Sequence, residues 1–401
     1  MNISQLQASA EHHLHAALSL LRKLVAVNSF TSNAEGVDEV ARLTAAAFAP
    51  LGFEAELVPC STPGTGHHLF LTHRGAGGDP IVLVTHSDTV FPPEEEQQND
   101  FKWDERPDEG RIYGPGTVDN KGGTALIWLI LQMLREAAPE AFERTHWMVA
   151  ANAAEEIIGD DFGRATAARC GGKARAVLVF EGGPKDERGW HIVTSRKGRS
   201  TWRLSAEGKA AHAGSKHHEG INSIDALAAV LPSVATLTNA AAERTVNIGL
   251  VHGGTVVNRV PHEAFAEWEC RATEPAMLQQ ADDFFASLSG TAPNGAKLNA
   301  ECTGYTAAWP GGSESLFQLW HEAAAQMDLT AISVPRGGLS DANHLWHLAP
   351  TLDGLGPYGN NAHCSERSPD GSKLPEYVEP GSFVPKAVMN ALALLKLATT
   401  S

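Results

Sequence analysis

The sequence contains no long apolar run and no paired cysteines, and each absence excludes a class of protein. No apolar stretch reaches the roughly 18 residues that a membrane-spanning helix needs. The longest candidate, residues 125–134, is expected to be a buried core helix. The five cysteines lie far apart and are odd in number, which gives neither a disulfide framework nor a thiolate zinc site. Residues 1–23 lack the pattern of a signal peptide, so a cytoplasmic location is the default expectation.

Basic residues are few relative to acidic ones. The chain of 401 residues has 31 Lys and Arg against 47 Asp and Glu, a formal net charge of −16. This balance argues against a surface for nucleic acid or anionic membrane, and it leaves many carboxylates free to bind cations. With 43% apolar and 19% charged residues, the composition is globular. The length favours two or three domains.

Several common catalytic signatures are also missing. There is no phosphate-binding loop, and the glycines of residues 75–78 precede a strand instead of following one, so a dinucleotide site is not expected. The segment Gly338–Ala342 lacks the final glycine of the α/β-hydrolase nucleophile elbow. The zinc-protease pattern His-Glu-x-x-His does not occur, because the pairs at 262–263 and 321–322 lack the second histidine.

Alternating helical and strand-like stretches predict an α/β domain with a mostly parallel sheet. The apolar run at residues 80–86 is typical of a central strand covered on both faces. The polar segment 92–108 is expected to be a long surface loop. Helices are expected at 4–27, 35–50 and 121–137, and strands at 53–59, 67–72, 80–86, 144–151 and 176–180.

The order of elements changes at about residue 192. From there the pattern predicts strand, helix, strand, strand, helix and strand, which is the ferredoxin-like split unit. We therefore predict a catalytic domain in two parts, 1–191 and 307–401, with a lid and dimerisation domain inserted at 192–306. The elements expected in the insertion are 192–205, 221–237, 244–252, 262–272, 275–289 and 296–304, and those after it are 313–327, 330–334, 341–347, 350–353 and 379–398.

Imidazole and carboxylate side chains follow several apolar strands or lie in glycine-rich turns. Strand ends in open α/β sheets are where loops converge on one crevice. Imidazole and carboxylate ligands suit zinc or a similar divalent cation at a catalytic site that keeps an open position for water. The residues are His86, Asp88, Asp119, Glu155, Glu156, Glu181 and His363.

Taken singly, some of these residues have simpler explanations. A lone histidine ending a buried strand, as His86 does, is more often a hydrogen-bonded core residue. An aspartate ahead of a helix, such as Asp119, is usually an N-cap. However, Asp88 lies on the same strand face as His86, where a carboxylate can fix the tautomer of a metal-bound imidazole. The glycines of Gly114–Gly123 are also more numerous than a cap requires, and they let the backbone bend tightly.

The glutamates also follow apolar strands. Side chains at Glu155 and Glu156 can point to different sides, so that one binds metal while the other acts as general base on the attacking water. Glu181 ends so apolar a strand that it needs a partner to offset the cost of burial. By itself, His363 is uninformative.

The order of these motifs resembles a known family. The chain reads His-x-Asp, then Gly-Pro-Gly-x-x-Asp-x-Lys-Gly-Gly, then Glu-Glu, then a glutamate after a strand, then a late histidine. With the ferredoxin-like insertion, this resembles the co-catalytic zinc aminoacylase and carboxypeptidase family over nearly the whole chain. Members include glutamate carboxypeptidase, acetylornithine deacetylase, succinyl-diaminopimelate desuccinylase and peptidase T. The resemblance implies two zinc ions per subunit, with cobalt or manganese as alternatives, and a homodimer through the inserted domain.

The resemblance implies the following metal ligands. Asp119 would bridge the two ions. His86 and Glu181 would complete one metal, and Glu156 and His363 would complete the other.

Other matching residues would have catalytic roles. Glu155 would be the general acid/base, and Asp88 would orient His86. In the inserted domain, His212 of Ala211–Gly214 would reach the partner subunit's active site and polarise the scissile carbonyl.

Three further matches concern the substrate. Asn258 in Gly253–Pro261 would contact it, Arg271 would hold its carboxylate, and Gly338 lies in the loop expected beside it. The sequence departs from the family at Leu339, where threonine is commoner, and in the long segment 364–378. Both departures fall near the expected substrate pocket and leave the exact substrate open.

These inferences predict a dimetal hydrolase that releases a C-terminal amino acid such as glutamate from a peptide or an N-acyl amino acid. An N-acyl amino acid deacylase needs the same machinery and is the alternative. A non-catalytic metal-binding scaffold is the alternative of another class, although a scaffold would have no need of Glu155. The expected partner is a small substrate, not a nucleic acid or a membrane.

Overall fold

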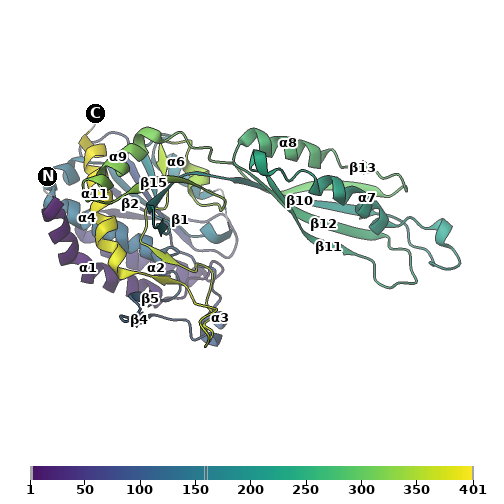
Figure 1. Ribbon diagram of the computed structural model, residues 1–401, viewed down its shortest axis with the longest axis horizontal. Coiled ribbons are helices and arrows are strands. Elements are labelled where there is room, and N and C mark those ends of the chain that lie inside the picture. The colour runs from purple at the N-terminus through teal and green to yellow at the C-terminus, as the bar shows by residue number, and fades with distance from the viewer. Residues whose placement is uncertain (1–2, 158, 160, 400–401) are drawn as a thin grey trace. The chain divides into compact units, whose positions relative to one another are not determined.

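The computed structural model describes residues 3–157, 159 and 161–399. The chain divides into two compact units (Figure 1). The first comprises Met1–Thr194, Gly311–Pro335 and Ser340–Ser401, and the second comprises Ser195–Pro310 and Arg336–Leu339. The insertion predicted from the sequence covers 192–306 and does not include 336–339.

A six-stranded sheet forms the centre of the first unit. Its order is β1-β2-β6-β3-β7-β16; β3, β6, β7 and β16 run parallel, whereas β1 and β2 are antiparallel to their neighbours. Every residue of β3, β6 and β7 is buried, as expected for strands covered on both faces. The predicted mostly parallel sheet is therefore confirmed. The strands are β1 (Glu54–Pro59), β2 (His67–His73), β3 (Ile81–His86), β6 (Trp147–Asn152), β7 (Ala176–Val179) and β16 (Thr351–Leu352).

Long helices pack together beside this sheet. Helices α1 (Ile3–Val25), α4 (Lys121–Ala137) and α11 (Phe383–Thr399) contact one another, and α9 (Glu314–Ala325) packs on α11. Twelve of the 17 residues of α4 are buried, as expected of the predicted core helix. In the described part of the chain, no helix is both long and apolar enough to cross a membrane. Further helices of this unit are α2 (Ala34–Phe48), α5 (Pro139–Arg144), α6 (Asp161–Arg169) and α10 (Ala342–Leu345).

Two predictions about individual elements are wrong. The single strand expected at 192–205 is two strands, β9 (Gly189–Arg196) in a small sheet with β8 (Lys185–Asp186) and β15 (Ala331–Arg336), and β10 (Gly198–Glu207) in the second unit. The chain passes close to its own backbone at Gly198, where a Cβ atom would lie 2.5 Å from the amide nitrogen of Ala308. Residues 194–201 carry no apolar side chain, so the apolar pattern does not show where one strand ends and the next begins.

The segment 92–108 is also more ordered than a loop. It contains the short helix α3 (Pro93–Gln98) and the strand β4 (Asp104–Arg106). Strand β4 joins a small sheet of order β17-β18-β5-β4 that the sequence did not indicate. Strands of two or three residues are too short to show a period. The others in this sheet are β5 (Arg111–Tyr113), β17 (Gly359–Asn360) and β18 (Tyr377–Val378).

The second unit is the predicted β-α-β-β-α-β arrangement. Its antiparallel sheet has the order β11-β12-β10-β14-β13, and the helices α7 and α8 pack on the strands. Trp202, Trp268 and Phe285 are among the core residues between the helices and the sheet. The elements are α7 (Ser223–Ala235), β11 (Thr245–Gly253), β12 (Glu263–Ala272), α8 (Pro275–Ala286), β13 (Gly290–Thr291) and β14 (Lys297–Thr306).

Candidate dimetal site

The carboxyl ends of three neighbouring parallel strands bring the predicted residues together. Strand β3 ends at His86, β6 leads into the short helix η2 (Glu155–Ile157), and Glu181 lies two residues beyond the end of β7. Because β3 lies between β6 and β7 in the sheet, the loops that follow these strands meet at one edge. The fold therefore places an imidazole and several carboxylates at the same position.

The first group of possible ligands is His86, Asp119 and Glu181. The Nε2 atom of His86 lies 2.9 Å from Oδ1 of Asp119 and 3.7 Å from Oε1 of Glu181. Asn120 donates a hydrogen bond from Nδ2 to the same Glu181 oxygen at 3.1 Å. One atom from each of the three residues lies within 4.8 Å of the others, so a single cation could contact all three.

The second group shares Asp119 with the first. The Nε2 atom of His363 lies 3.3 Å from Oδ2 of Asp119 and 3.2 Å from Oε2 of Glu156. The two carboxylate oxygens of Asp119 thus face the two different histidines. The backbone of His363 has φ +66°, which residues other than glycine seldom adopt, and such conformations concentrate at functional sites. This arrangement has the form of a bridging carboxylate between two three-ligand groups.

The glycines around Asp119 allow a close backbone approach. A Cβ atom on Gly123 would lie 2.3 Å from the carbonyl oxygen of Phe180, and one on Gly122 would lie 2.1 Å from that of Thr117. Only glycine therefore lets the first turn of α4 lie directly against the residue that precedes Glu181. This contact explains the glycine-rich motif better than a helix cap does, because Asn120 makes no capping hydrogen bond from its side chain.

Asp88 connects His86 to the two glutamates. The Nδ1 atom of His86 is 3.0 Å from the backbone oxygen of Asp88 and 3.3 Å from its Oδ1, which leaves Nε2 to face the ligands. The Asp88 carboxylate also accepts hydrogen bonds from the backbone N–H groups of Glu155 at 3.2 Å and Glu156 at 3.3 Å. Thr31 donates to it from Oγ1 at 2.7 Å. Asp88 therefore fixes the backbone of the glutamates as well as the imidazole.

The buried carboxylates of the site favour positive charge close to them. Burial raises the pKa of Glu155 well above its ordinary value, and the nearby carboxylates of Glu181, Asp341 and Glu156 add to this. Hydrogen bonds with Asp119 and Glu156 raise the pKa of His363 to about 10. Burial opposes ionisation of Asp119, but hydrogen bonds with His363 and His86 lower its pKa. The carboxylates thus favour positive charge on the neighbouring imidazole, as expected of a group of side chains that can bind cations.

The donor set fits divalent cations. The Oε1 atom of Glu156 is buried and has no hydrogen-bond partner, although buried carboxylate oxygens normally have one. An imidazole and carboxylates in each group, with no thiolate, match the ligands that zinc accepts in catalytic sites. His86, Asp119 and Glu181 would hold one ion, and Asp119, Glu156 and His363 the other.

The sequence motifs assign no role to Glu376. This residue is fully buried, and its Oε1 accepts hydrogen bonds from the backbone N–H groups of Val118 at 2.8 Å and Asp119 at 3.0 Å. Burial raises its pKa to about 8. Glu376 lies in the segment 364–378, which departs from the family pattern. A single acidic residue before a two-residue strand carries no periodic signal, so only the structure shows that it supports the bridging ligand.

Asp341 is a second buried carboxyl group beside the glutamates. It accepts a hydrogen bond from Nδ2 of Asn152 at 2.7 Å, and Oδ1 of Asn152 accepts from the N–H of Ala154 at 3.0 Å. Burial raises the pKa of Asp341 to about 7. Its loop resembles the family loop near the substrate, but the sequence did not single out this residue.

The residues expected in the lid lie in the second unit. His212 is exposed, and its Nδ1 accepts hydrogen bonds from the N–H groups of Gly214 at 3.1 Å and Ser215 at 3.2 Å. Because Nδ1 is an acceptor, Nε2 carries the proton and is free to donate. This is the tautomer that a residue polarising a carbonyl group needs.

The guanidinium group of Arg271 makes hydrogen bonds within the second unit. Its Nε and Nη2 donate to Glu269 at 2.9 and 3.2 Å, and Nη1 donates to the carbonyl oxygen of Gly337 at 3.1 Å. Two of the five N–H groups of a guanidinium therefore remain for another acceptor. Asn258 is exposed, and Gly338 accepts a hydrogen bond from Arg196 at 2.9 Å through its carbonyl oxygen.

Comparisons with known proteins agree with this architecture. Residues 194–293 match the family described as the peptidase dimerisation domain. Carboxypeptidase G2 from a Pseudomonas species is 27% identical over 250 residues, which is 62% of this chain and 58% of that protein. Acetylornithine deacetylase from Pectobacterium carotovorum is 26% identical over 266 residues, 61% of this chain and 64% of that protein. The alignments thus span less than two thirds of either relative.

Solved structures match the fold across almost the whole chain. The aminopeptidase PepT from Bacillus cereus has a TM-score of 0.77 and 21% identity, covering 96% of this chain and 99% of that one. The M20 family metallo-carboxypeptidase Sso-CP2 from Sulfolobus solfataricus has a TM-score of 0.70 and 17% identity, covering 95% and 99%. The resemblance to the zinc aminoacylase and carboxypeptidase family that the sequence motifs indicated is confirmed.

Proposed function

We propose that this chain, which resembles the co-catalytic zinc aminoacylase and carboxypeptidase family in motifs, dimerisation domain and fold, is a dimetal amide hydrolase. One observation supports this most strongly. Asp119 lies between two groups of three ligands, each with one histidine and one further glutamate, and the free Glu155 is beside them. A metal site with a purely structural role would need neither a carboxylate shared by two ions, such as that of Asp119, nor a neighbouring carboxylate that binds no metal, such as that of Glu155.

The chain's own residues supply the proton transfers. When bound by these residues, two cations would lower the pKa of a water molecule and polarise the substrate carbonyl. Glu155 takes the proton of that water as it attacks the amide and then delivers it to the leaving amine. Asp88 holds the backbone of Glu155 in place through Oδ1. The Nε2–H group of His212 donates to the oxyanion that forms on the carbonyl.

The proposed substrates carry a free carboxylate on the leaving amino acid. The remaining N–H groups of Arg271 can pair with that carboxylate, which gives selectivity for this end of the substrate. We favour an exopeptidase that releases a C-terminal amino acid such as glutamate. The similarity to acetylornithine deacetylase supports the second candidate, an N-acyl amino acid deacylase.

A substrate panel tests this proposal. Zinc- or cobalt-loaded protein is incubated with dipeptides and with acetyl and succinyl amino acids, and the released amine is measured. We expect turnover of substrates with a free α-carboxylate and little turnover of their carboxamides. The replacement Arg271→Met should raise KM for the carboxylates at least about tenfold, the loss of one charged hydrogen-bond pair. The matched control is Arg203→Met, which removes an arginine paired with Glu267 in the same sheet. If metal-loaded protein cleaves none of the panel, the proposal is wrong.

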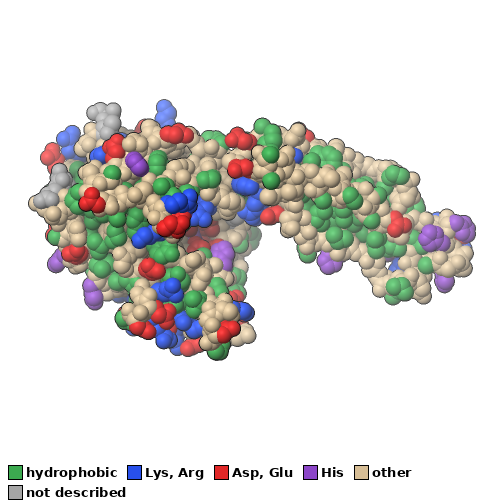
Figure 2. All heavy atoms as spheres, viewed as in Figure 1, with side chains coloured by type: hydrophobic (Ala, Val, Ile, Leu, Met, Phe, Trp, Pro, Cys, Tyr) green, Lys and Arg blue, Asp and Glu red, His purple; other side chains and the backbone are tan. Residues whose placement is uncertain are grey.

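We also propose that the second unit forms a homodimer through β11 and α7. Strand β11 is at the edge of its sheet, so its outer backbone groups are unpaired by the sheet. Leu250 and Val251 on this strand are 49% and 54% exposed, and Ile224 on α7 is 41% exposed. Figure 2 shows hydrophobic side chains gathered over this part of the second unit. An exposed edge next to apolar side chains is typical of a surface that another chain covers.

Charge on that edge should separate the subunits. The replacement Val251→Lys is expected to convert the dimer into a monomer, because a lysine on an edge strand opposes pairing. Light scattering after size-exclusion chromatography measures the mass. The matched control is Thr291→Lys on β13 at the opposite edge, which should stay dimeric. Because His212 is proposed to act across the interface, the monomer should be no more active than His212→Ala. A monomeric wild-type protein would contradict this prediction.

A further inference from the structure

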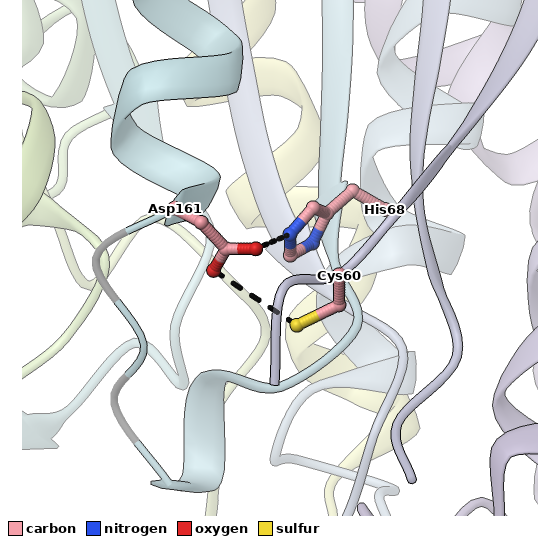
Figure 3. A group of neighbouring side chains, drawn as sticks. All are labelled: Cys60, His68 and Asp161. Carbon is pink, nitrogen blue, oxygen red and sulfur yellow. Dashed lines mark hydrogen bonds and ion pairs between the residues drawn. The ribbon is translucent and has the colours of Figure 1, made fainter. Parts of the chain in front are cut away.

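A third group of polar side chains lies outside the dimetal site. Cys60 follows β1, His68 lies on β2, and Asp161 begins α6 (Figure 3). One atom from each lies within 4.8 Å of the others, and His68 is 1% exposed. The group could be a cation site, or it could be a hydrogen-bonded structure with a different purpose.

The hydrogen bonds of the imidazole decide between these two. The backbone N–H of Ala153 donates to Nδ1 of His68 at 3.1 Å, so Nδ1 carries no proton. The ring proton is therefore on Nε2, which donates to Oδ2 of Asp161 at 3.2 Å. A metal on Nε2 would require an imidazolate, and an imidazolium would place a second N–H against that of Ala153. The neutral ring with its proton on Nε2 is the form that satisfies both bonds.

The surroundings favour this neutral form. Burial lowers the pKa of His68, and the hydrogen bond with Asp161 only partly opposes this. Burial opposes ionisation of Asp161, but hydrogen bonds from the backbone of Ser61 and from His68 lower its pKa to about 2. A neutral imidazole therefore donates to a carboxylate, and Cys60 adds a weak thiol contact to that carboxylate at 3.9 Å.

The two partners of His68 lie on either side of the catalytic glutamates in sequence. Ala153 precedes Glu155 by two residues, and Asp161 begins the helix that follows η2. The imidazole thus ties both sides of this segment to β2, which pairs with β6 in the sheet. Asp88 holds the middle of the segment through the N–H groups of Glu155 and Glu156.

We propose that His68 is a positioning residue that holds Glu155 and Glu156 in place by binding Ala153 and Asp161 with its two ring nitrogens. This inference rests on the proposed function, because it assumes that the glutamates are the base and a ligand. A small displacement of such groups has a large effect on rate, since catalysis depends on near-ideal positioning. Residues that hold ligands in this way typically contribute 10–100-fold to metal affinity or activity.

Amide replacements separate the two bonds. The amide of His68→Asn can occupy the place of Nδ1 and accept from Ala153, but it is too short to reach Asp161. The amide of His68→Gln can reach Asp161 but leaves the Ala153 N–H without its acceptor. We expect kcat to fall about 10–100-fold in His68→Gln with KM unchanged, and His68→Asn to recover much of that loss. The control is Cys60→Ser, which keeps the imidazole and should leave kcat near the wild-type value.

Two further measurements do not need a substrate. Zinc titration should give two ions per chain in the wild type and in Cys60→Ser, with weaker binding of one ion in His68→Gln. Hydrogen–deuterium exchange should be at least about tenfold faster over residues 153–157 in His68→Gln. Thermal unfolding shows whether each variant is folded; if His68→Gln is not, Asp161→Asn tests the other bond by the same measurements.

Several outcomes would overturn the proposal. A third zinc ion that Cys60→Ser removes would make this group a metal site. Unchanged exchange, zinc affinity and kcat in folded His68→Gln would show that the imidazole positions nothing. If the wild type cleaves no amide, the proposed function is wrong. Hydrogen–deuterium exchange and zinc affinity would still test the role of His68, because neither needs a substrate.

Discussion

Replacing Glu155 by glutamine is expected to lower kcat by about 10²–10⁴-fold, the usual contribution of a general base. The amide has nearly the same shape but cannot take the proton of the attacking water. Glu155 belongs to neither group of possible ligands, and its backbone N–H, which donates to Asp88, is unchanged. The protein should therefore fold normally and bind two metal ions. Steady-state kinetics on the best substrate of the panel, with elemental analysis of the same sample, measures both quantities.

The neighbouring glutamate provides a matched control. Glu156→Gln removes a ligand instead of a base, since Oε2 of Glu156 lies 3.2 Å from Nε2 of His363. This variant should lose affinity for one metal, and added zinc should partly restore its activity. Glu155→Gln should keep its metals and not respond to added zinc. If both variants behaved alike, or if Glu155→Gln kept near-normal turnover, the proposed division of roles would be wrong.

Replacing Asp119 by asparagine is expected to weaken the binding of both metal ions. In the structure each carboxylate oxygen faces a different histidine, at 2.9 Å for His86 and 3.3 Å for His363. An amide offers only one oxygen and no negative charge. Because bound metals contribute several kcal/mol to stabilising the transition state, activity should fall by at least about 100-fold. Metal content after dialysis against a weak chelator, measured with kcat, tests this.

Variants of residues that would bind only one of the two ions provide the comparison for Asp119→Asn. His86→Ala and His363→Ala each remove a residue that belongs to one group only, so each should weaken one of the two ions. Asp119→Asn should therefore lose more metal than either histidine variant. An Asp119→Asn protein that retained two tightly bound ions would show that Asp119 does not bridge them.

Much of the fold was predictable because the apolar patterns that indicate helices and strands lie within short stretches of sequence. The apolar run at 80–86 and the periodic stretches that became α1, α4 and α11 each bury a continuous surface, and burial of this kind is encoded in the order of residue types. The β-α-β-β-α-β order of the insertion was visible for the same reason. The division of 192–205 into β9 and β10 was not, because residues 194–201 carry no apolar side chain from which a period could be read.

The residues of the candidate site were predictable by type and position, but the hydrogen bonds between them were not. His86, Glu156 and Glu181 follow apolar strands, and parallel strands bring their carboxyl ends to one edge of the sheet. His363 was found through its resemblance to a family motif, since nothing local distinguishes it. Glu376 and His68 gave no signal at all, because each acts on backbone N–H groups from distant parts of the chain.

The sequence by itself determined which chemical groups are available and which elements carry them: carboxylates and imidazoles at strand ends, and no thiolate pair or nucleophile motif. Only the tertiary structure decided which nitrogen and oxygen atoms face one another. It showed that Asp119 lies between two histidines, that Asp88 accepts the N–H groups of both glutamates, and that His68 accepts that of Ala153. The reason is physical, because periodicity reports burial of side chains, whereas these contacts join residues far apart in the chain and depend on backbone position.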